Sequence, residues 1–193
     1  MPKKTLILLF IICFNLTAKA QTADEVYNQY LDFNLKRFEG SSTDALKLGE
    51  VILPNADKLP AKSKVSFYNA LAKLYEDDSQ SVEAIPLYEK VILVQPDYYV
   101  AHRALGYLYL KPADELWAKL QADNTNKEIA ALYKIAVLKA LPHLEKAQAC
   151  DPTDETLTLI KTLYNNIHDD ASLRSLNTRL AALKKNCVDI LTE

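Results

Sequence analysis

Residues 65–98 read VSFYNALAKLYEDDSQSVEAIPLYEKVILVQPDY, and this stretch decides the fold. Large and small side chains recur in it at helical spacing on both sides of a short acidic turn. Ala72 and Ala84 are small enough to let two antiparallel helices approach closely, and a turn at residues 77–79 connects them. Pro96 ends the second helix, because proline lacks a backbone donor and disfavours helical geometry in the preceding residue. The stretch therefore predicts one helical hairpin.

The spacing in this hairpin resembles that of the tetratricopeptide repeat, a unit of about 34 residues. A second copy follows immediately, and residues 140–146, ALPHLEK, parallel residues 84–90, AIPLYEK. The resemblance implies an all-α fold, a right-handed α-solenoid of about three to four antiparallel helical hairpins. The matching positions are Tyr68, Leu71, Ala72, Tyr75, Ala84, Tyr88 and Pro96 in the first copy, and His102, Leu105, Gly106, Tyr109, Ala140, Leu144 and Pro152 in the second.

The rest of the chain divides around these two copies. We expect a degenerate N-terminal hairpin at residues 21–60, the central repeat at 65–98, a second repeat at 99–152, and a third repeat with a capping helix at 153–191. The second repeat contains an insertion at about residues 111–132, because its two halves lie further apart than those of the central repeat.

Three features of the helices after residue 110 are predicted from prolines and apolar spacing. Pro112 separates the repeat from a short helix expected at residues 113–121. A long helix is expected from about Lys127, with a kink at Pro142. The closing helix is expected to run from about residue 171 to residue 191, with its apolar residues on one face.

The first twenty residues have the pattern of a secretory signal peptide. Two lysines at residues 3–4 precede an apolar run at residues 6–14, and residues 18–20, AKA, fit the rule for signal peptidase. We expect cleavage before Gln21 and export to the periplasm or beyond, in a Gram-negative bacterium. The alternatives are a membrane anchor, although a span needs about 20 apolar residues, and a lipoprotein at Cys13, although the residues before it are bulky.

The charge of the exported chain limits its partners. Removing residues 1–20 takes away three lysines and no acid, which leaves 20 basic and 25 acidic side chains, a formal charge of −5. The basic residues are scattered, whereas phosphate binding needs clustered lysine and arginine. The composition therefore argues against nucleic acid and anionic membranes as partners.

The sequence contains no recognisable catalytic constellation. His102, His143 and His168 stand apart from one another, and no pair of them has metal-ligand spacing. The acidic pairs at residues 77–78 and 169–170 fit turns better than acid–base chemistry. A glycine-rich phosphate loop and a nucleophile elbow are both missing from the sequence. We therefore expect a non-enzymatic protein without cofactor or metal, and a small-molecule substrate is not expected.

Resemblance to the repeat family implies a concave groove, lined by the first helices, that binds an extended peptide or a partner's helix. Trp117 in the insertion is a candidate contact at one end of that groove. The alternative is that Trp117, and likewise Tyr98 and Tyr107, only pack against neighbouring helices. The candidate groove residues are Asn69, Lys73, Glu76, Tyr98, Arg103 and Tyr107.

These features favour a non-catalytic protein–protein interaction scaffold of the cell envelope that binds a peptide or a partner protein. The alternative function is a structural subunit of an envelope assembly or secretion complex. Two cysteines, Cys150 and Cys187, are exposed to an oxidising compartment after export. They stand near the ends of neighbouring predicted helices, about 8–10 Å apart by packing, whereas a disulfide needs Cα atoms within about 7 Å. The sequence leaves two alternatives for Cys150 and Cys187, a disulfide bridge or two separate thiols.

Overall fold

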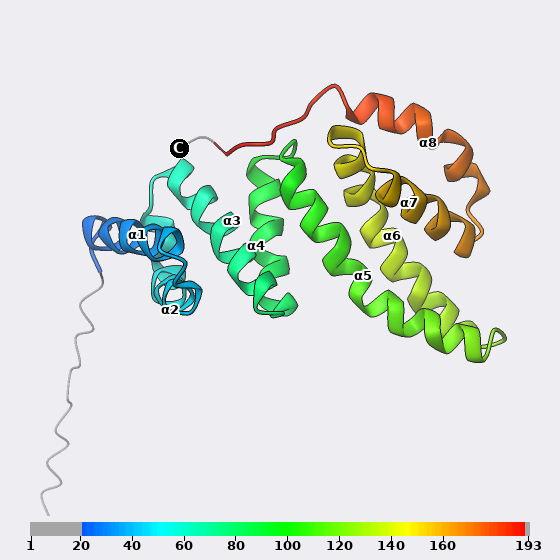
Figure 1. Ribbon diagram of the computed structural model, residues 1–193, viewed down its shortest axis with the longest axis horizontal. Coiled ribbons are helices and arrows are strands. Elements are labelled where there is room, and N and C mark those ends of the chain that lie inside the picture. Colours follow the sequence, from blue (N-terminus) through cyan, green and yellow to red (C-terminus); the bar gives the residue numbers. More distant parts are fainter. Residues whose placement is uncertain (1–20, 192–193) are drawn as a thin grey trace, which may run out of the picture.

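The computed structural model describes residues 21–191, and the proposed signal peptide lies outside the described residues (Figure 1). The described chain is all-helical, with one isolated β-bridge and no β-strand. None of its helices is long and apolar enough to cross a membrane. In chain order the elements are α1 (Ala23–Phe38), α2 (Ser42–Ile52), the 3₁₀-helix η1 (Leu53–Lys58), α3 (Ala61–Asp77), α4 (Ser81–Val94), α5 (Tyr99–Ala122), α6 (Lys127–Cys150), α7 (Asp154–Asn166) and α8 (Asp170–Leu183).

Consecutive helices pack in pairs, α1 with α2, α3 with α4, α5 with α6, and α7 with α8. The pairs follow one another along the molecule, since α2 contacts α3, α4 contacts α5, and α6 contacts both α7 and α8 (Figure 1). Large buried side chains from every pair, among them Phe33, Phe67, Leu105 and Ile160, join one continuous apolar core.

Local sequence signals account for the helix ends of the first two pairs. Thr22 caps α1, because its hydroxyl accepts the backbone N–H of Glu25 while the Glu25 carboxylate accepts that of Thr22. Gly40, at φ +77°, then turns the chain toward α2. In the central pair, α4 begins at Ser81, after the predicted turn, in which Ser79 has a positive φ of 62°.

The insertion differs from the prediction. The prediction of a separate helix at residues 113–121 is wrong, because α5 continues through Pro112 to Ala122. A proline in a helix interior costs about 3 kcal/mol, but Ala113 and Leu120 beyond it are buried, and this burial offsets the cost. Since α6 begins at the predicted Lys127, the insertion simply lengthens both helices of the pair.

The closing helix is also shorter than predicted, because α8 ends at Leu183 rather than at residue 191. Residues 184–191 leave the helix and run back toward the beginning of α3 (Figure 1). Two contacts hold this path: Cys187 forms a disulfide with Cys150, and Val188 pairs with Tyr98 in the β-bridge. Both contacts join residues that are far apart in the sequence, which local helical periodicity cannot predict.

At two places in the molecule, a tyrosine–glutamate hydrogen bond joins one helical pair to the next. The Tyr109 hydroxyl of α5 donates to Glu89 of α4, and the Tyr164 hydroxyl of α7 donates to Glu145 of α6 at 2.6 Å. Burial and the carboxylate acceptor both raise the pKa of each tyrosine, which keeps the hydroxyls protonated as donors. Glu89 and Glu145 occupy equivalent positions of the sequence repeat. The sequence repeat is therefore also a repeat of contacts.

Gly106 lies at the closest approach of α5 and α6. A Cβ placed on it would lie 2.7 Å from Leu144 Cδ2 and 3.2 Å from the Leu144 backbone nitrogen. The close helix contact predicted at this position is therefore confirmed. Gly49 of α2 makes a similar approach to Leu71 of α3, where a Cβ would lie 2.5 Å from Leu71 Cδ1.

Candidate functional site

Two of the six candidate groove residues, Lys73 and Glu76, are engaged within the α3–α4 pair. The Lys73 ammonium pairs with Asp77 one turn further along α3. Glu76 accepts a 2.7 Å hydrogen bond from the hydroxyl of Tyr88 on α4. Lys73 and Asp77 are exposed, and such a pair contributes little to stability in water, so Lys73 can still contact a partner.

Asn69 and Tyr98 are brought together, although 29 residues separate them. Asn69 Nδ2 donates to the Tyr98 hydroxyl at 3.4 Å, and the Tyr98 side chain is only 6% exposed. Tyr98 therefore packs against its neighbours rather than facing an open groove, which was the alternative given for this residue. The Asn69 carboxamide oxygen is buried and accepts no hydrogen bond from the residues that the structure describes.

Arg103 and Tyr107 lie on α5 and face the next pair of helices. Arg103 Nη2 donates to the carboxylate of Asp151 at 2.6 Å, and its guanidinium lies over the ring of Tyr99. The Tyr107 hydroxyl lies 3.2 Å from Thr156 Oγ1 at the start of α7. Because Tyr107 is still 43% exposed, it is the candidate groove tyrosine that a partner can reach.

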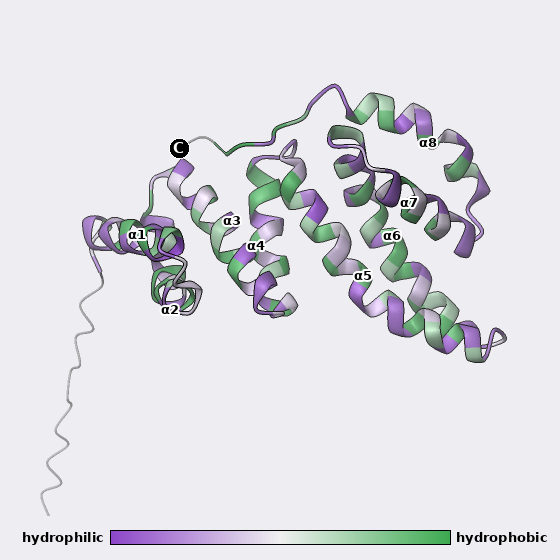
Figure 2. Cartoon of the chain, viewed as in Figure 1, coloured by the Kyte–Doolittle hydropathy of each residue, from purple (hydrophilic) through white to green (hydrophobic). Residues whose placement is uncertain are grey.

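An extended segment of the chain lies beside Asn69 and Tyr98. We call residues 188–191 the arm; they follow the disulfide and run along the beginning of α5 toward α3. The Val188 N–H donates to the Asp97 carbonyl at 2.8 Å, and the Tyr99 N–H donates to the Val188 carbonyl at 3.1 Å. These bonds form a parallel β-bridge. Figure 2 shows the residues after α8 change from hydrophilic to hydrophobic as the arm approaches α3.

Two cavities flank the arm, and Ile190 and Leu191 border both. One cavity, of about 330 Å³, is lined by residues at the beginning of α3 and at the end of α4, namely Ala61, Lys62, Val65, Val94 and Gln95. The other, of about 270 Å³, is lined by Arg37, Ser66, Asn69, Ala70 and Tyr98. The arm therefore lies on this surface without filling it.

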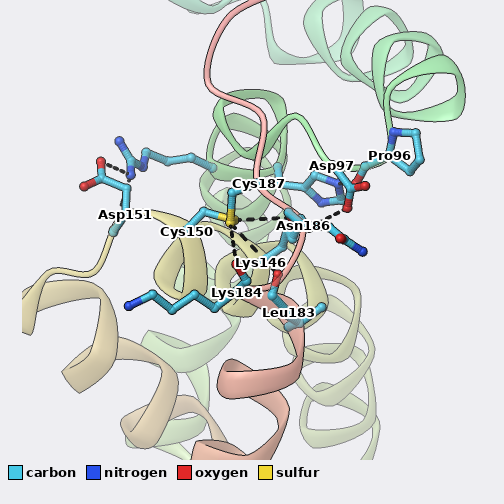
Figure 3. The surroundings of a disulfide bond; sticks show 11 residues. Pro96, Asp97, Lys146, Cys150, Asp151, Leu183, Lys184, Asn186 and Cys187 are labelled. Carbon is cyan, nitrogen blue, oxygen red and sulfur yellow. Dashed lines mark hydrogen bonds and ion pairs between the residues drawn. A yellow bond between two sulfur atoms is a disulfide. The ribbon is translucent and has the colours of Figure 1, made fainter.

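The chain just before the arm is held firmly (Figure 3). Cys150 and Cys187 form a disulfide with a Cα–Cα distance of 5.6 Å. They come closer than packed helix ends would allow, because α8 ends at Leu183 and Cys187 does not lie within a helix. The buried ammonium of Lys146 donates to Asp97 at 2.7 Å and also to the Asn186 carbonyl. These contacts end at Cys187, immediately before the arm.

Trp117 lies at a different place, near the tip of the α5–α6 pair. Its ring packs on Tyr133 of α6, with 5.1 Å between the ring centroids. Both rings line a cavity of about 530 Å³ that reaches the turn between α7 and α8, with Asn165, Asn166 and His168 on its far side. Its lining shares no residue with either cavity beside the arm.

The structure also brings together two histidines that are far apart in the sequence. His102 Nε2 lies 3.0 Å from the Pro96 carbonyl and must donate to it, so His102 Nδ1 is an acceptor in the neutral ring. His143 Nδ1 lies 2.9 Å from that atom and donates the proton. Burial, and then the neighbouring His102, lower the pKa of His143 to about 4. The sequence repeat could have indicated that these two side chains meet. It aligns His102 with Tyr68 and His143 with Leu87, which lie on the paired helices α3 and α4.

Within residues 21–191, no group of three or more histidine, cysteine, aspartate or glutamate side chains has the geometry to hold a metal ion. Comparisons of the chain with family models, curated proteins and solved structures found no match.

Proposed function

We propose that this protein is an exported, non-catalytic interaction scaffold of the tetratricopeptide-repeat type, and that it binds an extended peptide of a partner protein in a groove. Three observations support the architecture: the helices pack in consecutive pairs, Gly106 makes the close helix contact of the repeat pattern, and the tyrosine–glutamate contact recurs between pairs. In this proposal the pairs form a right-handed solenoid with α1, α3, α5 and α7 lining the groove.

One observation carries the proposed binding mode. An extended segment of the chain itself, the arm, pairs with Tyr98 in the β-bridge and lines one cavity together with Asn69, and these are two of the six candidate groove residues. A surface that receives one extended polypeptide through backbone hydrogen bonds, beside one mostly apolar and one mostly polar cavity, has the chemistry to receive another. Arg103 and the exposed Tyr107 extend this surface along α5, and tyrosine and arginine often dominate binding energy.

A second candidate function is that of a structural subunit of an envelope assembly. It is favoured by an exposed apolar surface formed by α4, α5 and α6. Val82 of α4 and Ile135 of α6 are largely exposed apolar residues. They border a shallow, mostly apolar cavity of about 430 Å³. Exposed apolar patches of this kind often mark protein contacts.

The test is affinity capture with residues 21–193 from envelope extract, followed by measurement of the captured partner's affinity for variants of the proposed groove. Arg103→Glu and Tyr107→Ala are each expected to weaken binding by about 30-fold, the equivalent of about 2 kcal/mol. Arg174→Glu on α8, an exposed charge reversal outside the groove, is the matched control. Circular dichroism verifies that each variant is folded.

Unchanged affinity in both groove variants would contradict the groove. If affinity fell only in Trp117→Ala, the binding site would move to the cavity beside Tyr133. If it fell only in Val82→Asp or Ile135→Asp, the second candidate function would replace the first.

A further inference from the structure

We propose that the arm, residues 188–191, is a built-in and exchangeable occupant of a peptide site, and that a partner's extended apolar segment displaces it while the disulfide stays closed. This inference rests on the proposed function and specifies its ligand. The site consists of the backbone of residues 97–99 and the two cavities beside the arm.

The contacts change abruptly at Cys187. Before it, the chain is held by a covalent bond to Cys150 and by the buried ammonium of Lys146. Beyond it, the arm has one β-bridge, Val188 and Leu191 are only half-buried, and Ile190 is 68% exposed. The two backbone hydrogen bonds contribute only a small net free energy, and the entropy lost on ordering each residue of the arm opposes it. The arm is therefore held weakly enough to exchange.

The geometry of the arm defines the segment that replaces it. A ligand must be extended, because it pairs in parallel with residues 97–99 through the Asp97 carbonyl and the Tyr99 N–H. It needs an apolar residue at the position of Val188, which packs against the core. At the position of Ile190 it benefits from a larger apolar side chain, because the cavity of about 330 Å³ beside Ile190 has a mostly apolar lining.

The disulfide sets how strongly the arm competes. A segment tethered by a few residues acts at an effective concentration in the millimolar range. A free peptide must overcome that concentration, so the intact chain binds partners more weakly than a chain without the arm. The tether therefore admits only ligands that fit the site better than the arm does.

The experiment compares two proteins, residues 21–193 and residues 21–187, which keeps Cys187 and its disulfide. The probe is a synthetic, N-acetylated peptide of residues 188–193, VDILTE, titrated into each ¹⁵N-labelled protein at up to millimolar concentration. We expect the shortened protein to bind it, with chemical-shift changes at the Tyr99 amide. We expect at least tenfold weaker binding by the intact chain, tighter binding of the peptide with Ile190→Phe, and loss of binding with Ile190→Asp.

A matched pair of variants at the end of α4 locates the peptide. Val94 lines the larger cavity and is 57% exposed, whereas its neighbour Leu93 is 84% exposed and does not line it. In the shortened protein, Val94→Asp is expected to abolish peptide binding and Leu93→Asp to leave it unchanged. Both substitutions are at exposed positions, so the fold should survive in each.

Three outcomes would overturn the inference. The first is a folded shortened protein whose Tyr99 amide does not respond to any of the peptides. The second is equal peptide affinity of the intact and shortened proteins, because the arm would then not occupy the site. The third is a dimer of the intact chain that becomes monomeric on shortening, because the occupant would then be the arm of a second copy. None of these affects the Arg103 and Tyr107 test, so the proposed function can stand when this inference fails.

Discussion

In the α5–α6 pair, Gly106 lies against Leu144 with no room for a Cβ, whereas Ile190 of the arm is mostly exposed beside two unfilled cavities. The α5–α6 pair is therefore closely packed at this point, whereas the arm lies on the surface beside unfilled space. The difference separates a part that must stay fixed from a part that can exchange. It also predicts that substitutions in the two regions have effects of very different size.

The largest effect is expected from Gly106→Leu. The new side chain must enter space occupied by Leu144, including its backbone, so the two helices have to separate. We expect the free energy of unfolding to fall by about 3 kcal/mol or more, at or above the usual range for overpacking. Chemical denaturation measures it, with Ala118→Leu at an exposed position of the same helix as control. Similar small losses in both variants would show that this contact is not close.

Removing the disulfide should have the next largest effect. The bridge spans 37 residues of chain, and cross-links of this length typically stabilise by about 2–4 kcal/mol. We expect the double variant Cys150→Ser/Cys187→Ser to lose about 2–3 kcal/mol, because Lys146 still holds the Asn186 carbonyl. Reductant should lower the stability of the parent protein to the same level and leave the double variant unaffected. Equal stability of the parent with and without reductant would mean that the bridge does not form in solution.

A smaller effect is expected from acid, through His143. Its folded-state pKa of about 4 lies below the ordinary value of 6.5, so the unfolded chain binds its proton first as the pH falls. The stability contribution is therefore complete above pH 6.5 and is lost as the pH falls toward 4. We expect a loss of about 1–2 kcal/mol, after allowing for the partial exposure of the ring.

The variant His143→Leu tests this assignment, since leucine occupies the equivalent position, Leu87, in the central repeat. Its stability should depend less on pH between 6.5 and 4 than that of the parent, with a residual dependence from His102, whose pKa is also lowered by burial. Denaturation curves over this pH range measure both proteins. The same pH dependence in both would place the titrating group elsewhere.

The smallest effect on stability is expected from removing the arm. Ending the chain at Cys187 deletes one β-bridge and two half-buried side chains, so the free energy of unfolding should fall by about 1 kcal/mol or less. Thermal and chemical denaturation of residues 21–187 against residues 21–193 measure the difference. A loss as large as that of the disulfide would make the arm a structural strap, and the contrast with the α5–α6 pair would disappear.

Much of the fold follows from short-range patterns. Thr22 and Glu25 predict the start of α1, the turn at residues 77–79 predicts the start of α4, and the repeat alignment places Gly106 at a close helix contact. These features depend on interactions within one or two helical turns or on a repeated spacing, which the sequence states directly. The candidate site was only partly predictable: Asn69 and Tyr98 do meet, but as partners of each other beneath the arm.

The sequence by itself determined that the chain is helical, where its paired helices begin, and which glycine lets two of them meet. Tertiary structure alone decided that α5 continues through Pro112, that His102 and His143 share a hydrogen bond, and that α8 stops at Leu183 so that Cys187 reaches Cys150. The physical reason is the range of the interactions. Burial against α6 outweighs the local preference of a proline, and contacts across 37 residues outweigh the helical preference of residues 184–191.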